Sequence, residues 1–250
     1  MRTVAVIPAR MASTRFPGKP LATLHGRPMI EHIFHRTRAC ADVDEVVVAT
    51  PDDDIRAAAE AFGATVVMTG DHHERASDRM AEVATRMDAD LWVLVQGDEP
   101  MLHPDMLTAA IGPFVRGEDV ECVNLAKRIT DERDLDDPNT IKVLIDLAGD
   151  ALIMTRRRVP TLGPGGLTET PVHKQVCIIP FTAEALARYA ALAPTPLERA
   201  ESIDMMRLIE HGRRVRMVET PFDTHAVDTE ADRALVEGLM ADDPLLGTYA

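Results

Sequence analysis

The sequence carries no excess of positive charge, and this excludes one broad class of function. It has 27 Lys and Arg residues against 41 Asp and Glu residues, so the formal net charge is −14 with histidine neutral. Binding to nucleic acid without sequence preference needs many Lys and Arg side chains that neutralise phosphates. A general nucleic-acid binder is therefore excluded, and a phosphate-bearing ligand would have to bind at a local cluster of cations.

Cysteines and long apolar runs are also scarce. The three cysteines, Cys40, Cys122 and Cys177, are an odd number without a C-x-x-C pair, which argues against a disulfide framework or a zinc ribbon. No run approaches the roughly 20 apolar residues of a membrane span, and the first residues show no signal-peptide pattern. We therefore expect a soluble, cytoplasmic protein that binds no membrane. A hydrophobic content of 46% can form a core, and this length fits a single domain over 1–250.

Short Val- and Ile-rich runs alternate with helical patterns in the first half of the chain. The predicted strands are 4–7, 46–49, 65–68 and 91–95, and the predicted helices are 29–39, 52–62 and 77–87. Continuous apolar strands separated by helices imply a parallel sheet that is covered on both faces. We predict an α/β fold with a doubly wound, mostly parallel sheet.

The middle of the chain changes character. Strands predicted at 122–127, 141–145 and 172–181 are joined by longer polar loops, so we expect an inserted β-rich part at about 122–181. The Gly- and Pro-rich loop at 162–171 has no periodicity and is a candidate flap or subunit contact. Two helical patterns and one strand follow, at 196–211, 229–240 and 213–218.

The loop after the first strand carries three cations in ten positions, Arg10, Arg15 and Lys19. Ligands of open α/β sheets bind outside the carboxyl ends of the strands, where this loop must lie. It is either a solvated basic turn or, as we favour, a cradle for a triphosphate. It is not a Walker A loop, because Pro20 replaces the hydroxyl that binds magnesium, and the G-x-G-x-x-G dinucleotide motif is absent.

Two aspartates follow other predicted strands. Asp98, within QGDEP, comes after the strand at 91–95, and Asp228 ends a short apolar run before a helix. Mg²⁺ usually binds through one or two carboxylates and substrate phosphates, so the pair could hold one or two metal ions against a triphosphate. Either aspartate could instead cap the helix that follows it.

The remaining polar clusters are less specific. Arg156 begins a run of three arginines, which is either a solvated turn or a clamp for an anionic substrate. The nine histidines show no metal-ligand spacing. His32 and His35 share a helix face without a third ligand, and His72 and His73 adjoin in a predicted loop, so we interpret all four as structural or solvated.

Six runs, taken in order, resemble those of the 3-deoxy-manno-octulosonate cytidylyltransferases. They are PARMASTRFPGKPL, QGDEP, DPNTIKVLID, TRRRVP, TPLERAES and AVDTEADR. The similarity spans nearly the whole chain. It implies an α/β fold of nucleotidyltransferase type with an inserted β-rich dimerisation and acceptor region, assembled as a homodimer. It also implies Mg²⁺ as the cofactor, and CTP and an anionic small-molecule acceptor as the partners.

The resemblance further implies a role for individual residues. The nucleotide-binding residues would be Ala9, Arg10, Arg15, Lys19, Arg79 and Gln96. The catalytic residues would be Arg10, Lys19, Asp98 and Asp228, of which Asp98 and Asp228 would bind the metal. The acceptor-binding residues would be Arg156, Lys174, Gln175, Glu201 and Asp204. An acceptor oxygen would then attack the α-phosphorus of CTP, and pyrophosphate would leave.

The sequence departs from the family pattern mainly where the acceptor would bind. Gln175 stands in place of a sugar-contacting histidine, and Asp204-Met205 stands in place of Glu-Gln. A buried polar group without a partner costs about 1–3 kcal/mol, which is enough to redirect specificity. We expect CMP transfer to 3-deoxy-manno-octulosonate or a close ulosonic acid. The alternatives are an amino-substituted sugar acid or a phosphonate as acceptor, or a nucleotide-binding regulator without catalysis.

Overall fold

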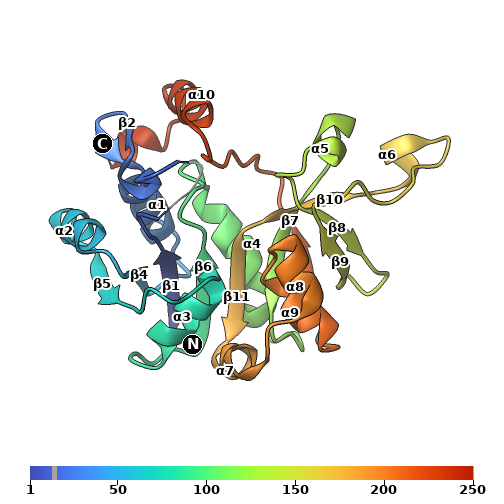
Figure 1. Ribbon diagram of the computed structural model, residues 1–250, viewed down its shortest axis with the longest axis horizontal. Helices are drawn as coiled ribbons and strands as arrows, with labels where there is room; N and C mark the ends of the chain where they lie inside the picture. Colours follow the sequence, from blue (N-terminus) through green and yellow to red (C-terminus); the bar gives the residue numbers. More distant parts are fainter. Residues whose placement is uncertain (13–15, 250) are drawn as a thin grey trace. The chain divides into compact units, whose positions relative to one another are not determined.

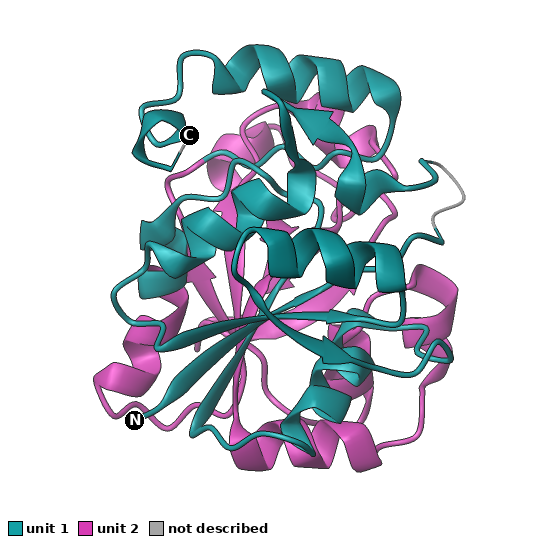
Figure 2. Cartoon of the chain, turned by 90° about the vertical axis from the view of Figure 1, so that its left-hand side faces the viewer, with its two compact units in different colours: residues 1–108, 223–250 teal, residues 109–222 magenta. Residues whose placement is uncertain are grey.

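The computed structural model of the protein describes residues 1–12 and 16–249. The chain forms two compact units (Figure 2). Unit 1 comprises Met1–Thr108 and Asp223–Ala250, and unit 2 comprises Ala109–Phe222. Unit 2 is therefore inserted into the sequence of unit 1. That residues 1–250 behave as a single domain stays a prediction.

Unit 1 contains four strands that pair in parallel in the order β6-β1-β4-β5 (Figure 1). Their bounds are Thr3–Pro8 for β1, Glu45–Thr50 for β4, Thr65–Met68 for β5 and Leu91–Val95 for β6. Strands β1, β4 and β6 are almost entirely buried, as their continuous apolar sequences require. The predicted α/β fold with a parallel sheet is confirmed.

Helices connect these strands. They are α1 (Met29–Arg38), α2 (Asp53–Ala61) and α3 (Ala76–Ala84), and α10 (Glu230–Met240) follows later in the chain. Helix α1 packs on β1 and β4, α2 on β4 and β5, and α3 on β1, β4 and β6. Three short elements between β1 and α1 were not predicted: η1 (Lys19–Leu21), β2 (Thr23–Leu24) and β3 (Arg27–Pro28). A short turn, η2 (Leu246–Thr248), follows α10.

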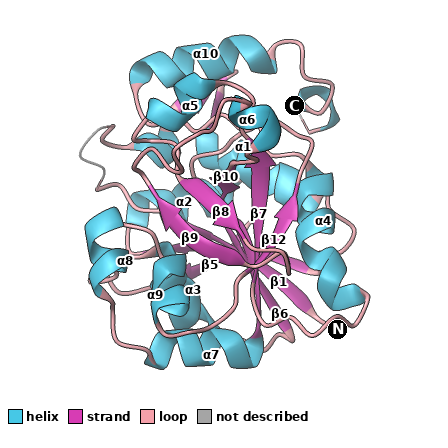
Figure 3. Ribbon diagram, turned by 90° about the vertical axis from the view of Figure 1, so that its right-hand side faces the viewer, coloured by secondary structure: helices cyan, strands magenta, loops and turns pink. Residues whose placement is uncertain are grey.

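The chain passes from unit 1 to unit 2 within α4 (Pro104–Val115). Unit 2 contains a mixed sheet of order β12-β7-β10-β8-β9 (Figure 3). Its strands are β7 (Val123–Arg128), β8 (Lys142–Ile145), β9 (Ala151–Thr155), β10 (His173–Val176) and β12 (Arg216–Glu219). Only β7 and β12 pair in parallel among these strands. Unit 2 also contains β11 (Ile178–Thr182) and the helices α5 (Glu132–Asp136), α6 (Gly166–Glu169), α7 (Ala183–Ala191), α8 (Pro196–Glu201) and α9 (Met205–Glu210).

Unit 2 departs from the predicted elements at several points. The strand predicted at 172–181 is two strands, because the chain bends at Cys177 after β10. The helix predicted at 196–211 is broken into α8 and α9, because Ser202 adopts a left-handed conformation with φ of 57°. The loop predicted at 162–171 contains the short helix α6. Strand β9 and helices α5 and α7 were not predicted.

No helix of the residues that the structure describes is long and apolar enough to cross a bilayer. The register of β1 and β6 decides where the candidate site lies. Thr3 pairs with Leu91 and Val6 with Leu94, so the carboxyl ends of both strands lie at one edge of the sheet. The loops that follow β1 and β6 therefore emerge side by side.

Candidate active site

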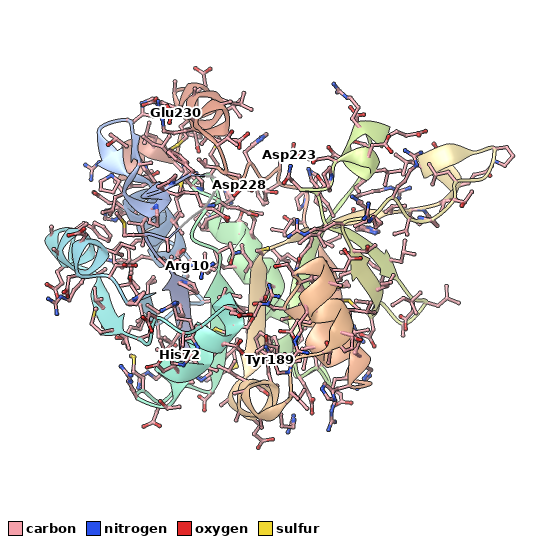
Figure 4. All side chains as sticks on the ribbon, in the orientation of Figure 1. Arg10, His72, Tyr189, Asp223, Asp228 and Glu230 are labelled. Carbon is pink, nitrogen blue, oxygen red and sulfur yellow. The ribbon has the colours of Figure 1, made fainter. Side chains whose placement is uncertain are left out.

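A cavity of about 330 Å³ opens in unit 1 at the carboxyl ends of β1 and β6. Its lining residues are Pro8, Ala9, Arg10, Ala12, Lys19, Pro20, His73, Glu74, Arg75, Ala76, Arg79, Gln96, Gly97, Asp98 and Asp228. Arg10 and Asp228, which are labelled in Figure 4, thus line the same cavity although they lie at opposite ends of the sequence. This is the location that the strand-end rule for open α/β sheets predicts.

Lys19 is at the centre of the charged residues in this cavity. Gly18, with φ of 72°, turns the chain into η1, which carries Lys19. The Lys19 Nζ lies 3.0 Å from Asp98 Oδ2 and 3.0 Å from Asp228 Oδ1. Burial alone would lower the pKa of Lys19, but the two carboxylates outweigh burial and raise the pKa above its ordinary value. Lys19 therefore stays charged at neutral pH.

Neither aspartate caps a helix. The N-cap of α10 is Thr229, whose Oγ1 accepts a hydrogen bond from Asp232 N, and Asp232 in turn accepts from Thr229 N at 2.8 Å. This capping box leaves the Asp228 carboxylate to contact Lys19. Asp98 also contacts Lys19 and lies well before the start of α4 at Pro104. The capping alternative is thus wrong for both positions.

The backbone around Asp98 explains how the two aspartates meet. Val227 N donates a hydrogen bond of 2.9 Å to Asp98 O, which joins the segment before α10 to the loop after β6. A Cβ on Gly97 would lie 2.7 Å from the carbonyl oxygen of Pro8. Only glycine therefore allows the loop after β6 to approach the end of β1 this closely. Sequence reasoning did not single out Gly97 for this reason.

Three arginines, Arg10, Arg75 and Arg79, also line the cavity. Arg10 is exposed, whereas Arg79 is 3% exposed and donates a hydrogen bond of 2.9 Å to Gly70 O and another to Thr69 Oγ1. Burial lowers the pKa of Arg79, and the positive charge of Arg10 lowers it further. An anion bound between the two guanidinium groups would relieve this repulsion.

The other predicted nucleotide-binding residues lie as follows. Ala9 lines the cavity although it is largely buried, and its N–H donates to Ala49 O at 2.9 Å. Gln96 lines the cavity beside Asp98. Arg15 lies outside the described residues.

Sequence reasoning missed the loop before α3. His73 was interpreted as structural or solvated, yet it lines the cavity and its Nε2 lies 2.5 Å from Glu82 Oε2. The same oxygen accepts from Gly70 N at 2.9 Å. Burial alone would raise the pKa of Glu82, but His73 and the Gly70 N–H outweigh burial and lower it. The ionised Glu82 thus holds this loop against α3. No local sequence pattern predicts this contact between Glu82 and His73.

The predicted acceptor-binding residues all belong to unit 2, and Arg156 and Glu201 come together there. Glu201 accepts hydrogen bonds from Thr155 Oγ1 at 2.7 Å and from Arg156 N at 2.9 Å. Burial alone would raise the pKa of Glu201, but these bonds outweigh it and lower the pKa. The guanidinium of Arg156 donates through Nε to Glu201 O and through Nη1 to the carbonyl oxygens of Pro138 and Asn139.

The other acceptor-binding predictions lie on β10 and before α9. Lys174 pairs with Asp134 at 3.3 Å, and Gln175 Nε2 donates to Asn124 Oδ1 at 2.6 Å. Asp204 occupies the N-cap position of α9 without a side-chain cap bond. Its neighbour Met205 is fully buried, with its Sδ 3.8 Å from Cys122 Sγ, and so belongs to the core of unit 2.

Known proteins match the chain over nearly its full length. The family model described as cytidylyltransferase matches residues 4–216. A 3-deoxy-manno-octulosonate cytidylyltransferase of Geobacter metallireducens is 42% identical over 241 residues, covering 93% of this chain and 95% of that protein. The protein of the same name from Myxococcus xanthus is 45% identical over 242 residues, covering 96% of each.

A solved structure gives the same result for the fold. The structure of a CMP:2-keto-3-deoxy-manno-octonic acid synthetase complexed with CTP matches with a TM-score of 0.89 and 34% identity, covering 97% of this chain and 100% of that one. The sequence comparisons and the structural comparison therefore indicate the same family. The chain belongs to the cytidylyltransferase family, among the 3-deoxy-manno-octulosonate cytidylyltransferases.

Proposed function

We propose that the protein transfers CMP from CTP to 3-deoxy-manno-octulosonate, or to a closely related ulosonic acid, with release of pyrophosphate. The observation that carries this proposal is the contact of one ammonium group, Lys19 Nζ, with both Asp98 and Asp228 inside a cavity that Arg10 and Arg79 also line. Relatives that bear the corresponding name, and one solved with CTP, support it.

The cations of the cavity suit a triphosphate. Lys19, Arg10 and Arg79 supply three positive charges, two of which repel each other in the free protein. Phosphate oxygens can accept hydrogen bonds from all three side chains, and charge-assisted hydrogen bonds of this kind are among the stronger ones. We expect the phosphates of CTP to bind here, with Gln96 and Ala9 near the nucleoside.

Magnesium is the cofactor we propose, and the donor groups fit it. Asp98 and Asp228 both present carboxylate oxygens to the Lys19 ammonium group, so their oxygens lie close to one point. Mg²⁺ prefers oxygen ligands from one or two carboxylates and substrate phosphates. Among residues 1–12 and 16–249, no group of three or more His, Cys, Asp or Glu side chains could hold a metal ion. The remaining ligands would therefore come from CTP and water. When bound, the metal would offset negative charge on the phosphoryl oxygens.

The protein's own side chains would act by position and charge. An acceptor hydroxyl oxygen would form a bond to the α-phosphorus while the bond from that phosphorus to the pyrophosphate oxygen breaks, and the hydroxyl proton would pass to solvent. A lysine ammonium is protonated at neutral pH, so Lys19 would donate hydrogen bonds and would not serve as a base. Together with Arg10 it would stabilise the charge that develops on the leaving pyrophosphate.

Arg156 is the residue we propose to bind the acceptor carboxylate. Its Nε and Nη1 donate to backbone carbonyls, which fixes the direction of the guanidinium group. No partner of Nη2 is found within the described parts of the chain, so this nitrogen can bind an anion. Gln175 favours a second candidate, a different anionic acceptor, because its amide takes the place of a histidine and is bonded to Asn124.

A panel of acceptors tests the proposal. Pyrophosphate release is measured with CTP and Mg²⁺ and, in turn, 3-deoxy-manno-octulosonate, its amino-substituted analogue and a phosphonate. Turnover with the first supports the proposed function, and turnover only with another acid moves the assignment to the second candidate. CTP binding without turnover on any acceptor contradicts both and indicates a regulator.

Two further properties belong to this proposal. We expect a homodimer in the cytoplasm. Light scattering should then give twice the chain mass of 27.4 kDa, and fractionation of cells should find the protein with the soluble fraction. A mass of one chain at assay concentration contradicts the first expectation.

A further inference from the structure

A buried polar network in unit 1 lies outside the cavity and is not used by the mechanism above. It is built on α1, where His32 and Arg36 are one helical turn apart. The two side chains are 0% and 1% exposed. Buried polar groups of this size need hydrogen-bond partners, and both residues have theirs in distant parts of the chain.

Arg36 contacts two distant segments, one at Leu102 and one near the C-terminus. Its Nη1 donates to Leu102 O at 3.4 Å, and its Nη2 donates to Asp243 Oδ2 at 2.6 Å. Its Nε donates to the hydroxyl of Tyr249 at 2.9 Å. His32 contacts the same hydroxyl through Nδ1 at 3.1 Å and Leu24 O through Nε2 at 2.8 Å.

The direction of each hydrogen bond follows from the chemistry of the groups. Leu24 O can only accept, so His32 Nε2 is protonated, and because burial lowers the pKa of His32 the neutral ring is favoured, whose Nδ1 is an acceptor. The Tyr249 hydroxyl therefore donates to His32 Nδ1 and accepts from Arg36 Nε. Hydrogen bonds thus run from Arg36 to Tyr249, from Tyr249 to His32, and from His32 to the Leu24 carbonyl. With a neutral histidine, each donor in this series has an acceptor.

These contacts join the chain segments that carry the three central residues of the cavity. Leu24 lies shortly after η1, which contains Lys19. Leu102 N donates to Glu99 O at 3.2 Å, in the loop that carries Asp98. Asp243 and Tyr249, the two partners that follow α10, lie in the C-terminal segment that starts at Asp228.

Tertiary contacts must align these segments, since Lys19 and Asp228 are 209 positions apart in the sequence. We propose that His32, Arg36 and Tyr249 are positioning residues, which hold the segments of Lys19, Asp98 and Asp228 in register. For its kinetic readout this inference rests on the proposed function. Tyr249 is the shared member, because both α1 side chains contact its hydroxyl.

Tyr249→Phe is the first test, because it removes this hydroxyl and keeps the ring that stacks on His35. We expect kcat to fall about tenfold, since misplacement of catalytic groups by an ångström can cost up to about 10²-fold. The KM for the acceptor should not change. The midpoint of thermal unfolding should fall by only about 2–4 °C, the size for one hydrogen bond in a chain of this length. A purely structural role would move the midpoint and leave kcat unchanged in folded protein.

His35→Gln is the matched control. His35 stacks on the Tyr249 ring at 5.2 Å between centroids, next to Arg36 in sequence, but it takes no part in the hydrogen-bond chain. Its replacement should leave kcat within about twofold of wild type, because no bond of the chain is lost. His32→Phe keeps a ring at this position and removes both hydrogen bonds of the imidazole, to Leu24 O and to the Tyr249 hydroxyl, so it should reduce kcat at least as much as Tyr249→Phe does.

The double variant His32→Phe/Tyr249→Phe completes the cycle. Since both changes remove the bond between Tyr249 and His32, the loss of kcat in the double variant should be smaller than the product of the two single losses. Single losses that multiply in the double variant, wild-type kcat in Tyr249→Phe, or an equal loss in His35→Gln each overturn the positioning role. Should His32→Phe fail to fold, Tyr249→Phe and its control still decide. A wild-type protein without turnover contradicts the proposed function instead, and CTP affinity with Mg²⁺ then serves as the readout for the same variants.

Discussion

The cavity of unit 1 and the predicted acceptor residues of unit 2 satisfy their polar groups in different ways. In unit 1, Lys19 contacts two carboxylates, and the positive charge of Arg10 repels that of Arg79. An anionic ligand bound beside these cations would reduce this repulsion. In unit 2, Arg156 and Gln175 are already bonded to backbone carbonyls and to Asn124. Unit 1 thus offers charge to a ligand, whereas unit 2 offers a few side chains whose directions are fixed.

This difference predicts that substitutions in the two units will affect different kinetic constants. Charge removed from unit 1 should lower kcat, because in the proposed mechanism the charges there would stabilise the transition state. A change in unit 2 should act on the KM for the acceptor. The variants below test this division, beginning with the largest expected effect.

Asp98→Asn should lower kcat by about 10²-fold or more, because one carboxylate of the proposed metal pair is lost where charge develops. Pyrophosphate release at saturating CTP and acceptor is the measurement. Asp105→Asn is the control, since Asp105 is 69% exposed and pairs only with His103 among the described residues. Near-normal turnover of Asp98→Asn would remove Asp98 from the metal site.

Glu201→Gln should raise the KM for the acceptor about tenfold and leave the KM for CTP unchanged. The amide cannot accept from both Thr155 Oγ1 and Arg156 N as the carboxylate does, and one lost charged hydrogen bond amounts to about 1.5–3 kcal/mol. Steady-state kinetics with each substrate varied in turn gives both constants. Glu184→Gln is the control, because that side chain is 88% exposed. A rise confined to the KM for CTP would break the division between the units.

Gln175→His should raise kcat/KM for 3-deoxy-manno-octulosonate by severalfold if this position selects the acceptor, since one neutral hydrogen bond contributes about 0.5–1.5 kcal/mol. Competition between two acceptors measures the change in preference. Met205→Gln gives the contrast: it would bury an amide beside Cys122, so it should lower the unfolding midpoint without improving acceptor use. No gain in Gln175→His would mean that position 175 does not select the acceptor.

The smallest expected effect is on pH dependence in unit 1. Burial lowers the pKa of His32 below its ordinary 6.5, and Arg36 and Arg27 act in the same direction, while the hydrogen bond to Leu24 O and the charge of Glu31 oppose them. The folded state thus favours neutral His32, so its contribution to stability is present above pH 6.5 and is lost as the pH falls through the lowered value. Unfolding midpoints across this range should fall more steeply in wild type than in His32→Gln. Parallel curves would exclude His32 as the titrating group.

Much of the fold and the centre of the site could be predicted from the sequence. Continuous apolar strands separated by helices dictated the parallel sheet, and the strand-end rule brought Lys19, Asp98 and the first loop to one edge. The convergence with Asp228 was also predicted, and the structure bears it out at 3.0 Å from Lys19. The roles assigned to these residues stay predictions.

The rest depends on tertiary geometry that no local pattern encodes. The break between α8 and α9 comes from the left-handed Ser202, a conformation that sequence propensity alone would not assign to serine. His73 lines the cavity because Glu82 on α3 holds its loop. Gly97 matters only because the Pro8 carbonyl lies against it. Each case requires knowledge of a partner far away in the sequence.

Replacement of Asp228 tests the central claim most directly, because this residue joins the centre only through the fold. Magnesium-dependent pyrophosphate release from CTP should be compared in wild type, Asp228→Asn and the exposed control Asp242→Asn. The account predicts a loss of about 10²-fold or more in Asp228→Asn and none in the control. A wild-type rate in Asp228→Asn would contradict a centre built from Lys19, Asp98 and Asp228.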